Sequence, residues 1–69
     1  MISVIVPVLN EEIAIEEFLR TLAAEQPDEI LVADGGSTDS TVERASRLAV
    51  VIPCPRGRGV QMNTAARLA

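Results

Sequence analysis

The sequence predicts an α/β protein in which three parallel strands alternate with three helices in the order β-α-β-α-β-α. Runs of β-branched and other apolar residues at positions 2–8, 29–33 and 50–52 predict three strands. The first is typical of a strand covered on both faces, the second is also expected to be buried, and the third is short. After a short connection, each run is followed by a segment whose apolar residues have helical spacing. Such alternation predicts right-handed crossovers and a parallel sheet.

The first helix is expected to begin soon after the first strand. Asn10 is a good N-cap, and Glu11 and Glu12 would complement the helix dipole in the first turn. Pro27 is expected to stop this helix. Its apolar stripe, at positions i, i+3, i+4 and i+7, comprises Ile15, Phe18, Leu19 and Leu22.

The second helix is expected to be capped by Asp39 or Ser40, because residues 40–43 read S-T-V-E and fit a capping box. Its inward stripe comprises Val42, Ala45, Leu48 and Ala49. A basic, flexible loop at 56–59 is expected before the third helix. The inward stripe of that helix comprises Met62, Ala65, Ala66 and Ala69.

The composition bounds the class of protein. A chain of 69 residues makes one domain at most, and its only aromatic residue is Phe18, so the core is expected to be aliphatic. The net charge of -4 argues against a nucleic-acid partner. The sequence shows neither a signal peptide nor a membrane span. We therefore expect a cytoplasmic protein, which could work at the inner face of the membrane.

Missing residue types exclude several kinds of site. Without histidine, the chain lacks the usual base at neutral pH and the commonest metal ligand. Without lysine it has no P-loop, and no G-x-G-x-x-G follows the first strand. The one cysteine, Cys54, cannot form an internal disulfide and is interpreted as structural.

Polar residues follow the first predicted strand. Asn10 and Glu11 could bind a base or ribose, with Pro7 and Leu9 packing on the ring. The alternative is a plain N-cap with an acid that suits the helix dipole.

The turn after the second predicted strand reads D-G-G-S-T-D at residues 34–39. Ligands of open α/β sheets bind outside the carboxyl ends of the strands, so Asp34 is a candidate for ligand contact. Gly36 would allow close approach of the backbone, beside Ser37. The alternative is a tight turn that Asp34 caps.

The third polar cluster contains Arg56 and Arg58, with Gln61 and Asn63 after them. Arginine offers a forked donor that matches phosphate, so a diphosphate clamp is one interpretation, with Arg58 the stronger candidate. A solvated basic loop is the other.

Together, residues 4–12, 32–41 and 55–63 resemble the start of family 2 glycosyltransferases of the GT-A fold. They look closest to a small bacterial branch with the turn D-G-G-S-T-D and a later loop P-R-G-R-x-x-Q-M-N. The resemblance implies a three-stranded, Rossmann-like half of a GT-A domain that binds a nucleotide sugar, with a UDP-sugar expected. Gly35 replaces the second acid of the wider family's turn, so contacts of that acid cannot be transferred.

The resemblance also implies which residues bind the donor. Positions matching the uracil and ribose include Asn10, Glu11 and Asp34, and Arg58 and Asn63 match the diphosphate loop. The full candidate set is Pro7, Leu9, Asn10, Glu11, Asp34, Gly36, Ser37, Arg58 and Asn63. The family's divalent metal, Mn²⁺ or Mg²⁺, is held by a D-x-D that these residues lack, and we expect neither a metal ligand nor a catalytic residue in this chain.

We expect residues 1–69 to be the N-terminal part of a larger domain, truncated at its C-terminus, because the last helix has no Gly or Asn cap. Three functional hypotheses follow. The chain is the donor-binding half of a glycosyltransferase, inactive alone; or a non-catalytic nucleotide-binding module; or a structural fragment that forms homo-oligomers through an open sheet edge.

Overall fold

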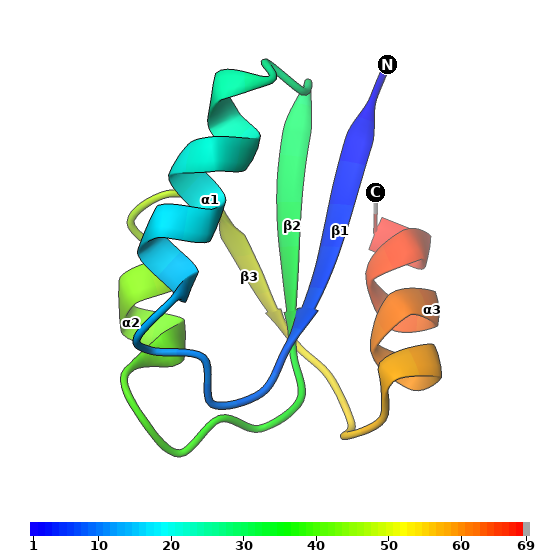
Figure 1. Cartoon of the computed structure of the whole chain (residues 1–69). Helices are drawn as coiled ribbons and strands as arrows, with labels where there is room; N and C mark the ends of the chain where they lie inside the picture. The colour runs from blue at the N-terminus through cyan, green and yellow to red at the C-terminus, as the bar shows by residue number, and fades with distance from the viewer. Residues whose placement is uncertain (69) are drawn as a thin grey trace.

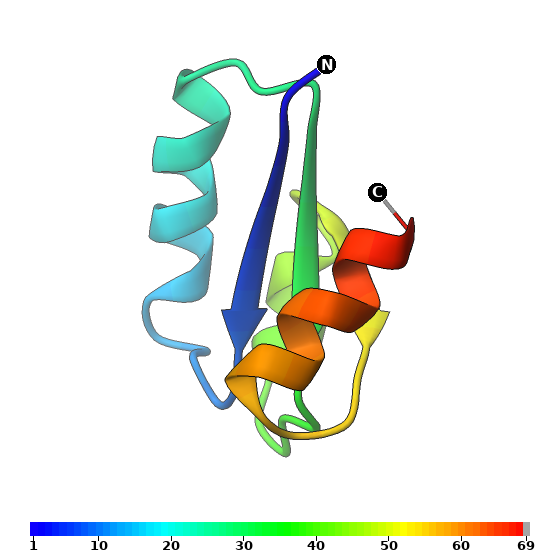
Figure 2. The same ribbon diagram turned by 90° about the vertical axis from the view of Figure 1, so that its right-hand side faces the viewer.

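A parallel three-stranded sheet forms the centre of the computed structural model, which describes residues 1–68. The strands β1 (Ser3–Val8), β2 (Glu29–Asp34) and β3 (Val50–Pro53) lie in the order β1-β2-β3. The helices α1 (Ile15–Ala24) and α2 (Thr41–Ala45) cover one face, and α3 (Arg58–Leu68) covers the other (Figures 1 and 2). The predicted α/β class and element order are confirmed.

The central strand β2 is buried on both faces, which explains its continuous apolar run. Val32 packs toward α1 and α2 in a cluster with Leu19 and Ala45. Its neighbours Leu31 and Ala33 point to the opposite face, where they pack with Ala65 of α3. Alternation along a strand therefore builds two small cores from one segment.

The three strands end at a common rim. The register pairs Val8 of β1 with Asp34 of β2, and Asp34 with Pro53 of β3. The loops that leave these ends lie together at the bottom of Figure 1. Pro7 and Pro53 lie in the two outer strands, where a missing N–H donor is tolerated.

The first helix begins later than predicted, and the N-cap assigned to Asn10 is wrong. Asn10 has a left-handed backbone (φ 53°), and a turn follows it in which the Ala14 and Ile15 N–H groups donate to the Glu11 carbonyl. Helix α1 then starts at Ile15 and ends at Ala24, before Pro27. Local capping is overridden because Asn10 binds the neighbouring loop.

The expected stripe of α1 is correct at Ile15 and Leu19, which are buried. Leu22 is partly buried against the same core, whereas Phe18 is 47% exposed. Phe18 instead borders a groove beside β1.

The stripe predicted for the second helix is only partly right. Ala45 is buried and Ala49 is partly buried, but Val42 and Leu48 are exposed. Thr41 is buried instead, because its hydroxyl serves the neighbouring loop. The predicted capping box does not form: Ser40 makes no side-chain cap, and its N–H donates to Glu12.

Helix α3 starts at Arg58, so the second half of the expected flexible loop is helical. Its buried face is formed by Gln61 and Ala65, whereas Met62 and Ala66 are exposed. Ala69 lies outside the described residues. The predicted stripe is therefore correct at Ala65 and wrong at Met62 and Ala66. It also leaves out Gln61, a polar residue whose amide is buried because it donates to two backbone carbonyls.

Candidate functional site

Three loops meet at the carboxyl rim of the sheet, and all the sequence-predicted site residues lie on these loops or the elements they join. The loop at 9–14 follows β1, the loop at 35–40 follows β2, and residues 54–57 lead from β3 into α3. This rim is where ligands bind in open parallel sheets.

Asp34 caps its own turn. Its carboxylate accepts hydrogen bonds from the Gly36 N–H (3.1 Å) and from the N–H and hydroxyl of Ser37. Only 5% of Asp34 is exposed. Gly36 is exposed, and its φ of 96° is a left-handed conformation that glycine adopts without strain. The turn interpretation of this cluster therefore describes the observed contacts.

Hydrogen bonds join the first loop to the second. The Asn10 N–H donates to the Ser37 hydroxyl (2.9 Å), and the Asn10 side-chain oxygen accepts from the Thr38 N–H (2.8 Å). The Glu12 carboxylate accepts from the Ser40 N–H (3.2 Å). Glu12 thus does for Ser40 what a capping-box glutamate would do, but from a different loop.

Thr41 and Asp39 complete this loop junction. The buried Thr41 hydroxyl donates to Asp39 and accepts from the Glu11 N–H (2.7 Å). The hydroxyl of Thr41 is the main cause that lowers the pKa of Asp39, aided by backbone N–H donors and opposed by burial. The resulting charged, hydrogen-bonded carboxylate stabilises the turn.

Glu11 and Arg58 line one pocket of about 220 Å³ at the rim, together with Pro7, Leu9 and Gln61. Among residues 1–68, neither the Glu11 carboxylate nor the Arg58 guanidinium forms an ion pair or a side-chain hydrogen bond. Both charges are therefore available to a ligand. The carboxylate can accept hydroxyl donors, and the guanidinium can donate to phosphate oxygens.

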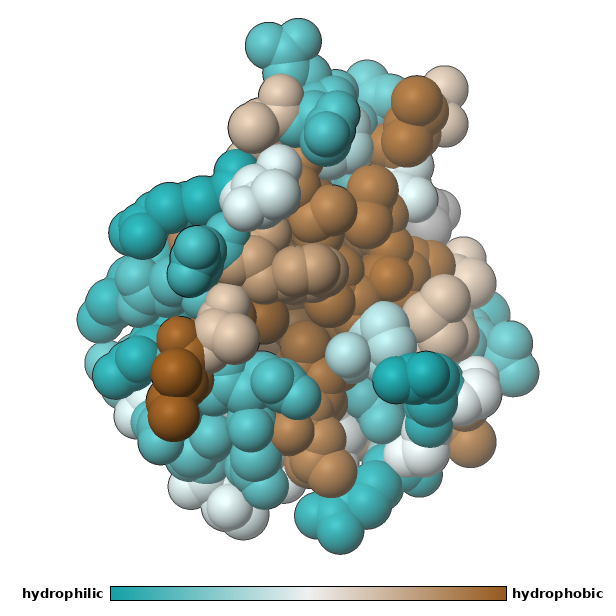
Figure 3. Space-filling view, viewed as in Figure 1, coloured by the Kyte–Doolittle hydropathy of each residue, from teal (hydrophilic) through white to brown (hydrophobic). Residues whose placement is uncertain are grey.

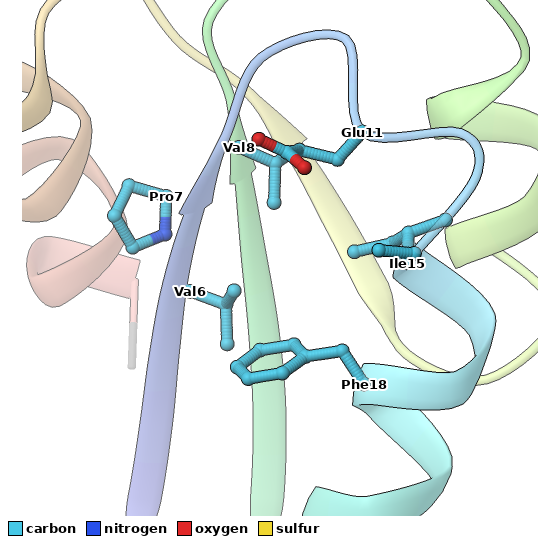
Figure 4. A pocket seen from close by; sticks show the side chains of 7 residues that line it. Val6, Pro7, Val8, Glu11, Ile15 and Phe18 are labelled. Carbon is cyan, nitrogen blue, oxygen red and sulfur yellow. The ribbon is translucent and has the colours of Figure 1, made fainter.

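An apolar groove of about 240 Å³ adjoins this pocket between β1 and α1. Val6, Ile15 and Phe18 line it, and Glu11 stands at its end near the rim (Figure 4). Its apolar walls with one carboxylate suit a flat ring that carries polar groups at one edge.

The other candidates are placed as follows. Leu9 and Pro7 line the pocket with Glu11, and Ser37 is half-buried beneath Asn10. Asn63 is exposed on α3 and is not among the residues that line this pocket. Cys54 is half-buried after β3, and burial, with the nearby charge of Asp34, raises the pKa of its thiol.

Sequence reasoning missed the roles of Thr41 and Gln61. Gln61 lies four residues before the buried Ala65, so helical spacing places it on the inward face of α3. The stripe was predicted from apolar residues alone, so the polar Gln61 was not included. The burial of Thr41 was not predicted for the same reason, because the stripe of α2 was assigned to apolar residues.

No group of three or more acidic, cysteine or histidine side chains is placed to hold a metal ion within residues 1–68. Asp34 and Asp39 are occupied by N–H and hydroxyl donors of their own turns. The described residues therefore do not fit a divalent ion by themselves.

The chain is an α/β unit with polar and charged groups at the ends of its parallel strands, where open sheets of this class bind ligands. The chain belongs to glycosyl transferase family 2, whose sequence profile matches residues 3–69. Its strands and helices have the Rossmann-like arrangement of the GT-A fold seen in solved relatives. The family and fold implied by the sequence motifs are confirmed.

Crystal structures of glucosyl-3-phosphoglycerate synthase from Mycobacterium tuberculosis are similar to the whole chain at 30% identity. The complex with Mn²⁺, UDP and glucosyl-3-phosphoglycerate gives a TM-score of 0.89, and that with Mn²⁺, UDP-glucose and glycerol 3-phosphate gives 0.90. The chain spans 29% of the protein chain in the first of these structures and 30% of that in the second. A comparison with curated proteins finds no match.

The helices within residues 1–68 are all too short or too polar to cross a lipid bilayer.

Proposed function

We propose that residues 1–69 form the nucleotide-sugar-binding part of a glycosyltransferase domain. The carrying observation is the rim pocket in which Glu11 and Arg58 present unpaired, opposite charges beside an apolar groove. A nucleoside diphosphate has matching parts: a flat base, ribose hydroxyls and an anionic diphosphate. The similarity to an enzyme solved with UDP supports this assignment.

The proposed contacts divide along the rim. Pro7 and Leu9 pack on the base, and Asn10 and Glu11 bind the base edge or the ribose. Arg58 donates to the diphosphate, since a guanidinium binds phosphate in a forked geometry. Asp34, Gly36 and Ser37, at the second loop, complete the proposed donor-binding set. Asn63 of α3 is the remaining member and is assigned to the diphosphate side.

The proposed donor is a UDP-sugar, and the proposed subgroup is the small bacterial branch with the D-G-G-S-T-D turn. In the transfer, the bond between the anomeric carbon and the diphosphate oxygen breaks, and a bond to an acceptor hydroxyl oxygen forms. The acceptor proton passes to a base and UDP leaves with the bonding electrons. Arg58 offsets charge that develops on the leaving diphosphate.

The proposal also covers the metal, the acceptor, the location in the cell and the oligomeric state. A divalent ion, Mn²⁺ or Mg²⁺, is held by a D-x-D beyond residues 1–69, and the base and acceptor site lie there too. The protein works in the cytoplasm, with the inner face of the membrane as a second place of work. Homo-oligomers form through the β1 edge.

Isothermal titration of the intact protein that contains this chain, with UDP as ligand, tests the proposal. Arg58→Ala should weaken UDP binding about tenfold or more, because a charge-assisted hydrogen bond contributes roughly 1.5–3 kcal/mol. Arg67→Ala, which removes an exposed arginine from the last turn of α3, is the matched control and should bind normally. Absence of UDP binding to the unmodified protein would reject the proposed function.

A further inference from the structure

Gln61 is the most buried polar side chain of α3, with 4% of the residue exposed. Its amide nitrogen donates to the Val8 carbonyl (3.1 Å) at the end of β1 and to the Ala33 carbonyl (2.7 Å) in β2. One side chain therefore joins α3 by hydrogen bonds to the carboxyl ends of two strands.

The same amide also holds the entry to α3. Its oxygen accepts from the Gly57 N–H (3.1 Å), while the Gln61 N–H donates to the Gly57 carbonyl (2.8 Å). Gly57 is thus held at both its backbone groups, in a left-handed conformation with φ 128°. Arg58 is the next residue, so the two hydrogen bonds to Gly57 fix the backbone position from which the Arg58 side chain extends.

Gly35, in the second loop, lies directly against the Gln61 side chain. A Cβ at position 35 would lie 2.7 Å from the Gln61 side-chain oxygen and 2.9 Å from its Cδ. The Gly35 backbone is not in the left-handed region, so the space occupied by Gln61 is the obstacle to a side chain. The amide could not swing aside without losing its bonds to the two strands and to Gly57.

We propose that Gln61 is a positioning residue that holds Arg58 across the rim pocket from Glu11, and that Gly35 is required because Gln61 fills its side-chain volume. The geometry gives the reason: the three amide contacts converge on the ends of β1 and β2 and on the residue before Arg58. Gln61 itself also lines the pocket.

The claim that Gln61 leaves no room for a side chain at position 35 is called here the exclusion between the two positions. It is tested without any ligand, by urea unfolding of a double-mutant cycle. Gly35→Ala should lower the unfolding midpoint in the native background and lower it much less in Gln61→Ala, where the volume is vacant. Gly59→Ala is the control, since no atom lies within 4 Å of a Cβ there and its φ is not left-handed. It should leave the midpoint unchanged or raise it.

A second variant keeps the volume but removes the hydrogen bonds. Gln61→Met should remain sensitive to Gly35→Ala, because its side chain still occupies the space. Equal effects of Gly35→Ala in the native, Gln61→Ala and Gln61→Met backgrounds would overturn the exclusion.

The positioning of Arg58 rests on the proposed function and is tested with UDP and uridine on the intact protein. Gln61→Ala should weaken UDP binding several-fold and uridine binding much less, because only UDP reaches Arg58. In an Arg58→Ala background, Gln61→Ala should have little further effect on UDP. A residue with a merely structural role would lower the affinity for both ligands together.

Equal losses for UDP and uridine, or effects of the two substitutions that simply multiply, would overturn the positioning role. If the unmodified protein binds no UDP, the proposed function fails and the positioning role fails with it. The exclusion between Gly35 and Gln61 is then still decided by the unfolding cycle.

Discussion

Two residues at the rim, Thr41 and Asp39, stabilise the fold through hydrogen bonds that join neighbouring loops. Thr41 is fully buried, and its one hydroxyl links a carboxylate on its own side to a backbone N–H of the first loop. The Asp39 carboxylate accepts hydrogen bonds from the Glu12 N–H of the first loop and from the Thr41 N–H at the start of α2. These two residues fix the relative positions of the loops that carry the candidate site.

Asp39→Asn should remove an acid-sensitive part of the stability. The folded pKa of Asp39 lies below its ordinary value of 3.8, so its contribution is present above that pH and is lost as the pH falls through the lowered value. Urea midpoints should therefore differ between native and variant protein at pH 7 and converge as the pH falls below 3.8 and through the lowered pKa of Asp39. Glu25→Gln, an exposed acid after α1, is the control, and a gap that stays constant with pH would contradict this prediction.

Thr41→Val should destabilise the fold by about 1–3 kcal/mol, because the Glu11 N–H loses its acceptor in a part-buried place. The two side chains have nearly the same shape, so the loss is one of hydrogen bonding. Thr21→Val serves as the control on the exposed surface of α1, where the hydroxyl only bonds its own helix. A free energy of unfolding that falls equally in both variants would contradict the assigned role.

At the scale of elements, the strands follow from the sequence more fully than the helix ends. Apolar runs place β1, β2 and β3 to within one residue at each end, although only β2 is buried on both faces. The start of α1 could not be read locally. Asn10 has good capping chemistry, but bonds to Ser37 and Thr38 outweigh it, and such contacts between distant segments leave no periodic signal.

The candidate site divides in the same way. Glu11 and Arg58 were found from their places after strands, and the structure does bring them to one pocket. The burial of Gln61 was not foreseen, because a helix stripe is sought among apolar residues. Asp34 was correctly placed at the rim, but its engagement by its own turn depends on backbone geometry that the sequence alone does not fix.

The left-handed backbone at Asn10 predicts an unusual order of variants. Asn10→Gly should be less destabilising than Asn10→Ala, although both lose the bond to the Thr38 N–H. Glycine adopts φ near 53° without strain, whereas alanine does not. Urea unfolding of the two variants measures the difference, and an alanine variant that is as stable as the glycine variant would refute this account of the loop.

In the whole molecule, helices cover both faces of the sheet, and β1 and β3 form its two edges. Figure 3 shows an apolar band over β1 between α1 and α3. The groove beneath it is lined by Val4, Val6, Phe18, Leu22 and Met62, among others. An uncovered strand edge with apolar flanks favours pairing with another strand.

Phe18→Glu should therefore reduce the proposed self-association, because the charge would lie beside the β1 edge. Ile13→Glu is the matched control: Ile13 is 94% exposed but lies in the first loop, away from this groove. Sedimentation velocity over a range of concentrations measures the effect. A native protein that stays monomeric throughout would refute the edge-mediated association.

We propose above that the carboxyl rim of the sheet binds a nucleoside diphosphate. Chemical-shift mapping by NMR, with UDP added to the labelled protein, tests it most directly. If UDP binds there, amide signals from residues 9–11, 34–37 and 57–61 should shift together and saturate. Shifts confined to the opposite rim, around residues 27–30 and 48–50, or no shifts at all, would contradict it.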